Sequence, residues 1–94
     1  MKVGKHTAFL IDFVSDFADG KMLRHDFDLD YSAYVIEYFP KMERENLRIA
    51  RKFANTVDSA VEYATAHNIS DDDFRISVNN ALCDLLGTNM PDLL

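Results

Sequence analysis

The sequence contains few of the residues that crosslink or interrupt a chain: one cysteine, two prolines and three glycines. A single cysteine, Cys83, excludes an intramolecular disulfide and any metal site built from several cysteines. Few prolines and glycines leave little room for long loops, so we expect mostly regular structure. Cys83 lies in the apolar run 81–86, which favours a core-facing thiol over a catalytic nucleophile.

Basic residues are also scarce, with ten Lys and Arg against sixteen Asp and Glu and a formal net charge of -6. This balance argues against a general nucleic-acid binder, because neutralising phosphates needs a basic surplus. It argues equally against docking on an anionic membrane. A positively charged protein partner fits the charge better.

Long uncharged apolar runs are missing, so nothing in the sequence predicts a membrane span. The N-terminal stretch is interrupted by Asp12 and Asp16 and does not match a signal peptide. We therefore expect a cytoplasmic protein. The 94 residues suffice for one core, and a hydrophobic content of 48% is too high for a disordered chain. These observations predict a single helical domain over residues 1–94.

Hydrophobic periodicity is helical nearly throughout. Apolar residues spaced three and four apart predict a first helix that ends at Gly20, a second over about 23–39, a third over about 41–66 and a fourth from Ser70 to Gly87. Pro40 should end the second helix or open the third. Ser70 is an expected N-cap, with acids in the turn that follows. Residues 88–94 are expected to form a short tail.

The predicted fold is all-α, a compact antiparallel four-helix bundle. The apolar positions are Phe9, Leu10, Phe13, Val14 and Phe17 in the first helix; Phe27, Tyr31, Tyr34, Val35 and Tyr38 in the second; Leu47, Ala50, Ala54, Val57, Val61 and Ala64 in the third; and Phe74, Val78, Ala81, Leu82 and Leu85 in the fourth.

Catalytic and metal-binding patterns find little support. Asp26, Asp28, Asp30 and Glu37 have the spacing of a calcium loop, but Tyr31 occupies the position that needs glycine. The same acids fit the solvated start of a helix better. The three histidines have no zinc-ligand spacing, no serine lies in a nucleophile turn, and three scattered glycines cannot build a phosphate loop. We expect no enzyme activity, no catalytic residue, no cofactor and no metal.

A basic stripe lies in the middle of the chain. Arg44, Arg48 and Arg51 are spaced to share one helix face, with Lys41 and Lys52 beside it. The favoured interpretation is that these residues flank the apolar stripe and pair with neighbouring acids. Phosphate binding is the alternative, and no aromatic stacking platform accompanies it.

A group of acids gathers near the junction of the last two predicted helices. Asp58 and Glu62 are four residues apart and share a face, and Asp71, Asp72 and Asp73 open the next helix. Because the end of one helix and the start of the next lie side by side in an antiparallel pair, these five acids could form one negative surface. Capping and solubility explain them as well. Such a surface also raises association rates with basic partners.

The pattern resembles the colicin D immunity protein family and similar small immunity proteins of contact-dependent growth inhibition systems. The likeness covers roughly residues 9–87. It rests on the apolar ladder of residues 9–23, on Asp26-Phe27 and Tyr31, on a long central helix, and on Tyr63 with the acid-rich turn 68–75 and the apolar positions after it.

The resemblance implies an inhibitor that protects a cell by occluding the active site of a toxin, often a nuclease that cleaves tRNA. It implies that Asp58, Glu62, Asp71, Asp72 and Asp73 contact the cognate toxin nuclease domain, with no direct nucleic-acid or membrane contact. An alternative function is a small acidic adaptor, or a phage-type inhibitor, of a nucleic-acid-binding protein. The sequence leaves the oligomeric state open.

Overall fold

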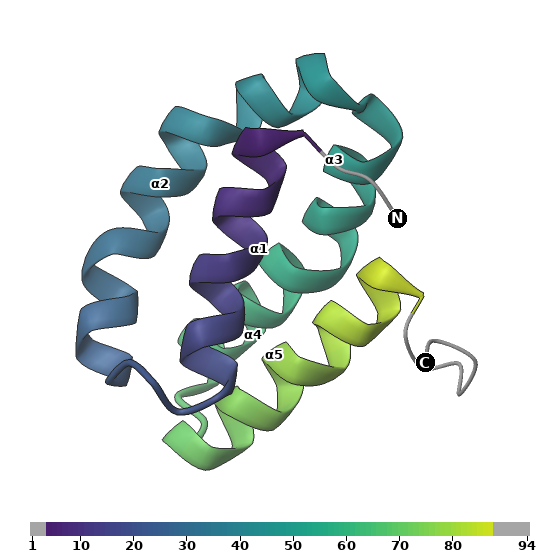
Figure 1. Ribbon diagram of the computed structural model, residues 1–94. Helices are drawn as coiled ribbons and strands as arrows, with labels where there is room; N and C mark the ends of the chain where they lie inside the picture. Colours follow the sequence, from purple (N-terminus) through teal and green to yellow (C-terminus); the bar gives the residue numbers. More distant parts are fainter. Residues whose placement is uncertain (1–3, 88–94) are drawn as a thin grey trace.

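The computed structural model describes residues 4–87 as an all-α compact globule of four helical segments (Figure 1), with no strand in that range. This confirms the predicted fold class. The predicted tail, residues 88–94, lies outside the described residues. One segment is a rod of three consecutive pieces, of which the middle one is a π-helical turn. The elements are α1 (Lys5–Ala18), α2 (Arg24–Glu45), the rod formed by α3 (Leu47–Phe53), η1 (Ala54–Asp58) and α4 (Ser59–His67), and α5 (Asp71–Leu86).

Successive segments reverse direction, as Figure 1 shows, and α5 crosses the others at an angle. α1 packs against α2 and α5, and the rod packs against α5 along its length. α2 contacts the rod mainly through α3. Toward α4 the two segments separate, and a groove lies between them.

The core lies where these segments meet. On α1 the buried apolar residues are Leu10, Val14 and Phe17, while Phe9 is 38% exposed at the edge. Aromatic rings dominate the centre, because Phe17 lies 4.4 Å from Phe27 and 4.8 Å from Phe74, centroid to centroid. All five apolar positions predicted for the last helix are buried, which confirms its register: Phe74, Val78, Ala81, Leu82 and Leu85.

Residues with positive φ end three of the segments. Gly20 has φ 82° after α1, and the N–H groups of Gly20 and Lys21 donate to the carbonyls of Phe17 and Asp16, which is the Schellman arrangement. Asn68 (φ 50°) follows α4, and Gly87 (φ 68°) follows α5. The predicted stops at Gly20 and Gly87 are confirmed.

Pro40 neither ends nor opens a helix, so that prediction is wrong. α2 continues through it to Glu45, and the chain breaks at Asn46, which is extended with φ -165° and ψ 100°. Pro40 and Ile36 are both exposed on α2, and the helix continues although the Ile36 carbonyl has no N–H partner at Pro40. The Asn46 side chain accepts the Ile49 N–H at 3.2 Å and caps α3, so the break falls where a cap is available.

The third predicted helix begins later than expected and contains the π turn η1. The extra residue in such a turn shifts the buried face, which passes through Phe53, Val57, Val61 and Ala64. Leu47, predicted to lie in the apolar stripe, is 44% exposed at the start of α3. The prediction was wrong there because the spacing alone does not reveal the break at Asn46.

The first turn of α1 is capped by a side chain from the far end of α2. The Glu45 carboxylate accepts hydrogen bonds from the His6 N–H at 2.9 Å, the Thr7 N–H at 2.9 Å and the Thr7 hydroxyl at 2.7 Å. Desolvation raises the pKa of Glu45, but these hydrogen bonds outweigh it, and the net pKa is below the ordinary value. Gly4 holds the N-cap position, where a Cβ would overlap the Glu45 side chain.

Within residues 4–87, no helix is both long enough and apolar enough to cross a lipid bilayer.

Candidate functional site

A groove lies on the described surface between α2 and α4. It has two adjoining parts, of about 360 Å³ and about 380 Å³, which share Tyr31, Ser32, Val61 and Thr65. Tyr31 and Val61 are only 4% and 8% exposed and form its floor. One wall of the groove is α2, and the other wall is α4 with the end of η1.

Acidic side chains dominate the edges of the groove. Asp28 lines one part from α2, and Asp58 and Glu62 line the other part from the rod. The only cation among the lining residues is Arg24, at the end formed by Asn68. The groove therefore presents three carboxylates against one guanidinium.

A hydrogen bond across the groove joins its two walls. The Tyr31 hydroxyl donates to Asp58 Oδ1 at 2.9 Å. Burial raises the pKa of Tyr31, and the charges of Asp58 and Glu62 raise it further. The phenol is therefore neutral near pH 7 and remains a donor, which holds the Asp58 carboxylate in place at the groove edge.

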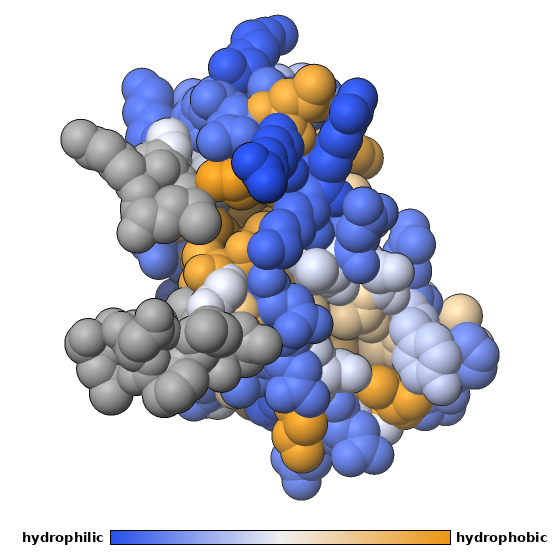
Figure 2. All heavy atoms as spheres, turned by 90° about the vertical axis from the view of Figure 1, so that its right-hand side faces the viewer, coloured by the Kyte–Doolittle hydropathy of each residue, from blue (hydrophilic) through white to orange (hydrophobic). Residues whose placement is uncertain are grey.

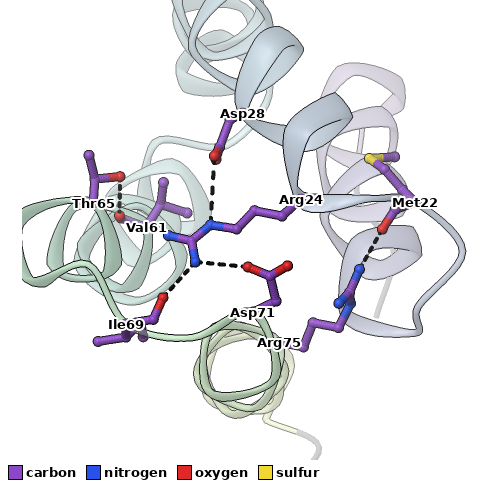
Figure 3. Close-up of polar contacts among 8 residues, drawn as sticks. All are labelled: Met22, Arg24, Asp28, Val61, Thr65, Ile69, Asp71 and Arg75. Atoms are coloured by element: carbon purple, nitrogen blue, oxygen red, sulfur yellow. Dashed lines mark hydrogen bonds and ion pairs between the residues drawn. The ribbon is translucent and has the colours of Figure 1, made fainter.

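Arg24 closes one end of the groove (Figure 3). Its side chain extends from the first turn of α2 toward α4 and the start of α5. It donates to the Ile69 carbonyl at 2.6 Å and to Asp71 at 3.1 Å, and its Nε lies 3.7 Å from Asp28. The guanidinium also lies 4.8 Å from the centre of the Phe74 ring. Asp71 is thus partly neutralised inside the molecule.

A second arginine joins α5 to the opposite corner. Arg75 donates to the Phe17 carbonyl at 3.1 Å and to the Met22 carbonyl at 2.7 Å, as Figure 3 shows for Met22. Phe17 is in the last turn of α1, where a cation complements the helix dipole. Arg24 and Arg75 therefore tie the two loops at this end of the molecule, 19–23 and 68–70, to the helices opposite them.

The five acids predicted to contact a partner fall into three groups. Asp58 and Glu62 line the groove, and Asp71 lies at its Arg24 end. Asp72 and Asp73 are exposed on the first turn of α5 and line neither part of the groove. The Ser70 hydroxyl accepts the Asp73 N–H at 3.2 Å, which confirms the predicted cap.

Three residues of this site are not predicted from the sequence. The apolar spacing places Tyr31 in a buried stripe, the acid spacing places Asp28 in a possible calcium loop, and no pattern singles out Arg24. The segment from Arg24 is helical, which confirms the solvated helix start and is incompatible with a calcium loop. The spacing of Asp28 and Tyr31 on α2 does not indicate that α4 packs across the groove from them.

The basic residues of the middle of the chain do not form one stripe, and most of them do not pair with acids as predicted. Arg44 lies in the last turn of α2, and the break at Asn46 separates it from Arg48 and Arg51. Among the described residues, Lys41 is the only member with an acidic partner, Glu37 at 3.9 Å. The other four cations are exposed and make no ion pair within residues 4–87: Arg44, Arg48, Arg51 and Lys52.

Other features of the described surface are simpler. Figure 2, which views the right-hand side of Figure 1, shows a hydrophilic ridge with apolar patches on both sides of it. In the described part of the chain, no three His, Cys, Asp or Glu side chains gather closely enough to hold a metal ion.

Comparisons of the chain with protein-family models, with curated proteins and with solved structures found no match.

Proposed function

We propose that this chain is a small inhibitor of the immunity-protein type, which binds a basic toxin domain through the groove between α2 and α4. The observation that supports the proposal most strongly is the carboxylate lining of that groove over a tyrosine floor. The proposal assigns binding to the chain, and no catalysis. The toxin domain would be a nuclease whose active site is basic, because it handles phosphates.

The charges of the groove favour a cationic occupant. Asp28 and Asp58 stand on opposite walls, and Glu62 extends the same acidic edge along α4. An Arg or Lys side chain from the partner would meet carboxylates from both helices. Hydrogen bonds between an ionised pair are about twice as strong as neutral ones.

The Tyr31–Asp58 hydrogen bond fixes part of the site before a partner arrives. A carboxylate that is already held loses less conformational entropy on binding, and preorganisation of this kind increases affinity. The Tyr31 and Val61 floor supplies apolar contact for the stem of a long basic side chain.

Glu62 is the most informative residue to change. It is exposed on α4, and no ion pair or hydrogen bond of its side chain occurs within residues 4–87. Glu62→Lys should therefore leave the fold intact and lower the rate of association with the toxin domain. The difference in association rate from the wild type should be larger at low salt, because charges are screened less there. Reversing Asp71, Asp72 and Asp73 together is a less clean test, because it also removes the Arg24–Asp71 pair and opposes the α5 dipole.

The functional experiment is a growth-rescue test. The C-terminal domain encoded by the neighbouring upstream gene would be expressed with and without this chain, and survival would be scored. We expect rescue by the wild type, loss of rescue by Glu62→Lys, and full rescue by Asp12→Lys, which makes the same charge change on the exposed face of α1. A harmless neighbouring domain, or toxicity that the wild type does not relieve, would refute the immunity function. Equal rescue by both variants would refute the groove as the site.

A further inference from the structure

The outer face of α2 has an apolar seam that no other element covers. α2 forms one edge of the molecule in Figure 1, and no described segment lies outside it. Leu29 is 64% exposed and Ile36 is 77% exposed. Ala33 and Pro40 are exposed on the same face. We call these four residues the α2 seam.

The spacing of the α2 seam is that of a helix contact. The residues follow one another at intervals of four, three and four, and at about 100° per residue they fall within about 60° of one another around the helix. Apolar residues repeated in this way are typical of a seam between two helices. On the core-facing side α2 already has its own apolar residues, led by Phe27 and Tyr31.

The charges beside the seam are arranged so that the face complements itself. Asp26 and Arg44 lie on one flank, 18 residues or five helical turns apart, and neither forms an ion pair within residues 4–87. His25 and Glu43 lie on the other flank with the same separation. On the first flank, the acid Asp26 is near the start of α2 and the base Arg44 is near its end.

From this arrangement we propose that the α2 seam binds a second copy of this chain, with the two α2 helices antiparallel about a two-fold axis. A register that places Leu29 against Pro40 of the second copy also places Ala33 against Ile36 of the second copy. The same register sets Asp26 opposite Arg44 of the second copy and His25 opposite its Glu43, each twice by symmetry. A parallel pairing would instead bring the two different flanks together, with Asp26 beside His25 and Arg44 beside Glu43 of the second copy, and would leave Asp26 and Arg44 far apart.

The dimer is expected to be weak. The seam extends over residues 29–40, about 17 Å along the helix axis. A single helix pair of this length falls at the low end of interface sizes, below about 1,200 Å² in total, where association is transient. We expect a dissociation constant on the order of 10–100 µM.

The dimer does not depend on the proposed function. The α2 seam and the groove share no residue, and Ser32 of the groove lies beside the His25 flank of the seam. Loss of the dimer would leave the growth-rescue experiment unchanged, so the two proposals fail separately.

Sedimentation velocity on the complete chain tests the dimer. Samples from about 10 µM to about 1 mM span the expected midpoint, at low ionic strength and with a reductant that prevents Cys83 from crosslinking two copies. The wild type should shift with concentration from a 10.8 kDa monomer toward twice that mass. A monomer at every concentration would overturn the proposal.

A matched pair of variants locates the interface. Ile36→Glu should raise the dissociation constant about tenfold or more, because it places two unpaired carboxylates in the seam. Ile76→Glu makes the same change at a residue that is 60% exposed on α5 and should leave the dimer intact. Far-UV circular dichroism checks that both variants keep their helices. Equal weakening by the two variants would exclude the seam.

A charge swap tests the register. Asp26→Lys and Arg44→Asp should each weaken the dimer, because each brings like charges together across the two-fold axis. The double variant restores opposite charges and should recover most of the wild-type affinity. Failure of the double variant to recover any affinity would exclude the antiparallel register.

Discussion

At the scale of single residues, Glu45 has the clearest structural role. Its carboxylate accepts two N–H groups from the first turn of α1 and the Thr7 hydroxyl, so one side chain supplies the cap that Gly4 lacks. Two of the four N–H groups that an α-helix leaves without intrahelical acceptors are satisfied in this way. Thr7 is almost fully buried at 1% exposure, so its hydroxyl needs this partner.

Glu45→Gln should destabilise the protein at pH 7 by about 0.5–2 kcal/mol, the range for loss of an N-cap. Since the folded pKa of Glu45 lies below its ordinary value of 4.5, the wild-type advantage is complete above that value and disappears as pH falls through the folded pKa. Urea unfolding at pH 7 and at about pH 3 measures this. Glu43→Gln, at an exposed residue two positions earlier, should be nearly neutral at both. A difference between Glu45→Gln and the wild type that persists unchanged at acid pH would contradict the charge-based account.

At the scale of elements, helical periodicity was sufficient where local signals agree. Ser70 and Gly87 bound α5 where predicted, because the cap and the positive-φ residue act within one turn of the sequence. Periodicity failed at residues 40–47, although the Asn46 cap of α3 is as local as the Ser70 cap, because α2 continues through Pro40 to Glu45, which reaches the distant α1. The α2–α4 groove depends in the same way on contacts between distant segments. The sequence predicts that Asp58 and Glu62 are neighbours on one helix face. It does not predict that Tyr31 and Asp28, from another helix, line the same groove.

Ser70→Ala tests how much the cap of α5 contributes. The hydroxyl that accepts the Asp73 N–H is lost, and we expect a decrease of about 1 kcal/mol in the free energy of unfolding. Chemical denaturation followed by circular dichroism gives the value. Ser59→Ala removes an exposed hydroxyl inside a helix, where alanine is the better helix former, and should be neutral or slightly stabilising. Similar losses in both variants would mean that the cap contributes nothing specific.

At the scale of the whole molecule, two arginines hold one end of the fold together. Arg24 reaches from α2 to the α4–α5 connection, and Arg75 reaches from α5 to the α1–α2 connection. The exposed Arg24–Asp71 ion pair adds only about 0–1 kcal/mol. The bonds from the guanidinium groups to carbonyls contribute more, because they satisfy backbone groups that have left the helices.

Arg75→Met keeps the long stem against Phe17 but removes both carbonyl contacts. We expect a loss of about 2–4 kcal/mol, since hydrogen bonds to charged groups contribute about 1.5–3 kcal/mol each and the Met22 carbonyl regains water. Thermal and urea unfolding measure it, with Arg51→Met at an exposed residue of α3 as the matched control. A loss no larger than that of the control would mean that the contacts of Arg75 do not stabilise the fold.

The cap on α1 also determines how fast two backbone amides exchange with solvent hydrogen. The first amides of a helix usually exchange quickly, because they have no intrahelical acceptor. The N–H groups of His6 and Thr7 are instead bonded to a side chain 39 and 38 residues away. They exchange only when the start of α1 leaves the end of α2, which is a local opening of the packed helices. The exchange rates of these two amides therefore measure how often α1 and α2 separate. In most helices the amides at this position report only the fraying of the helix end.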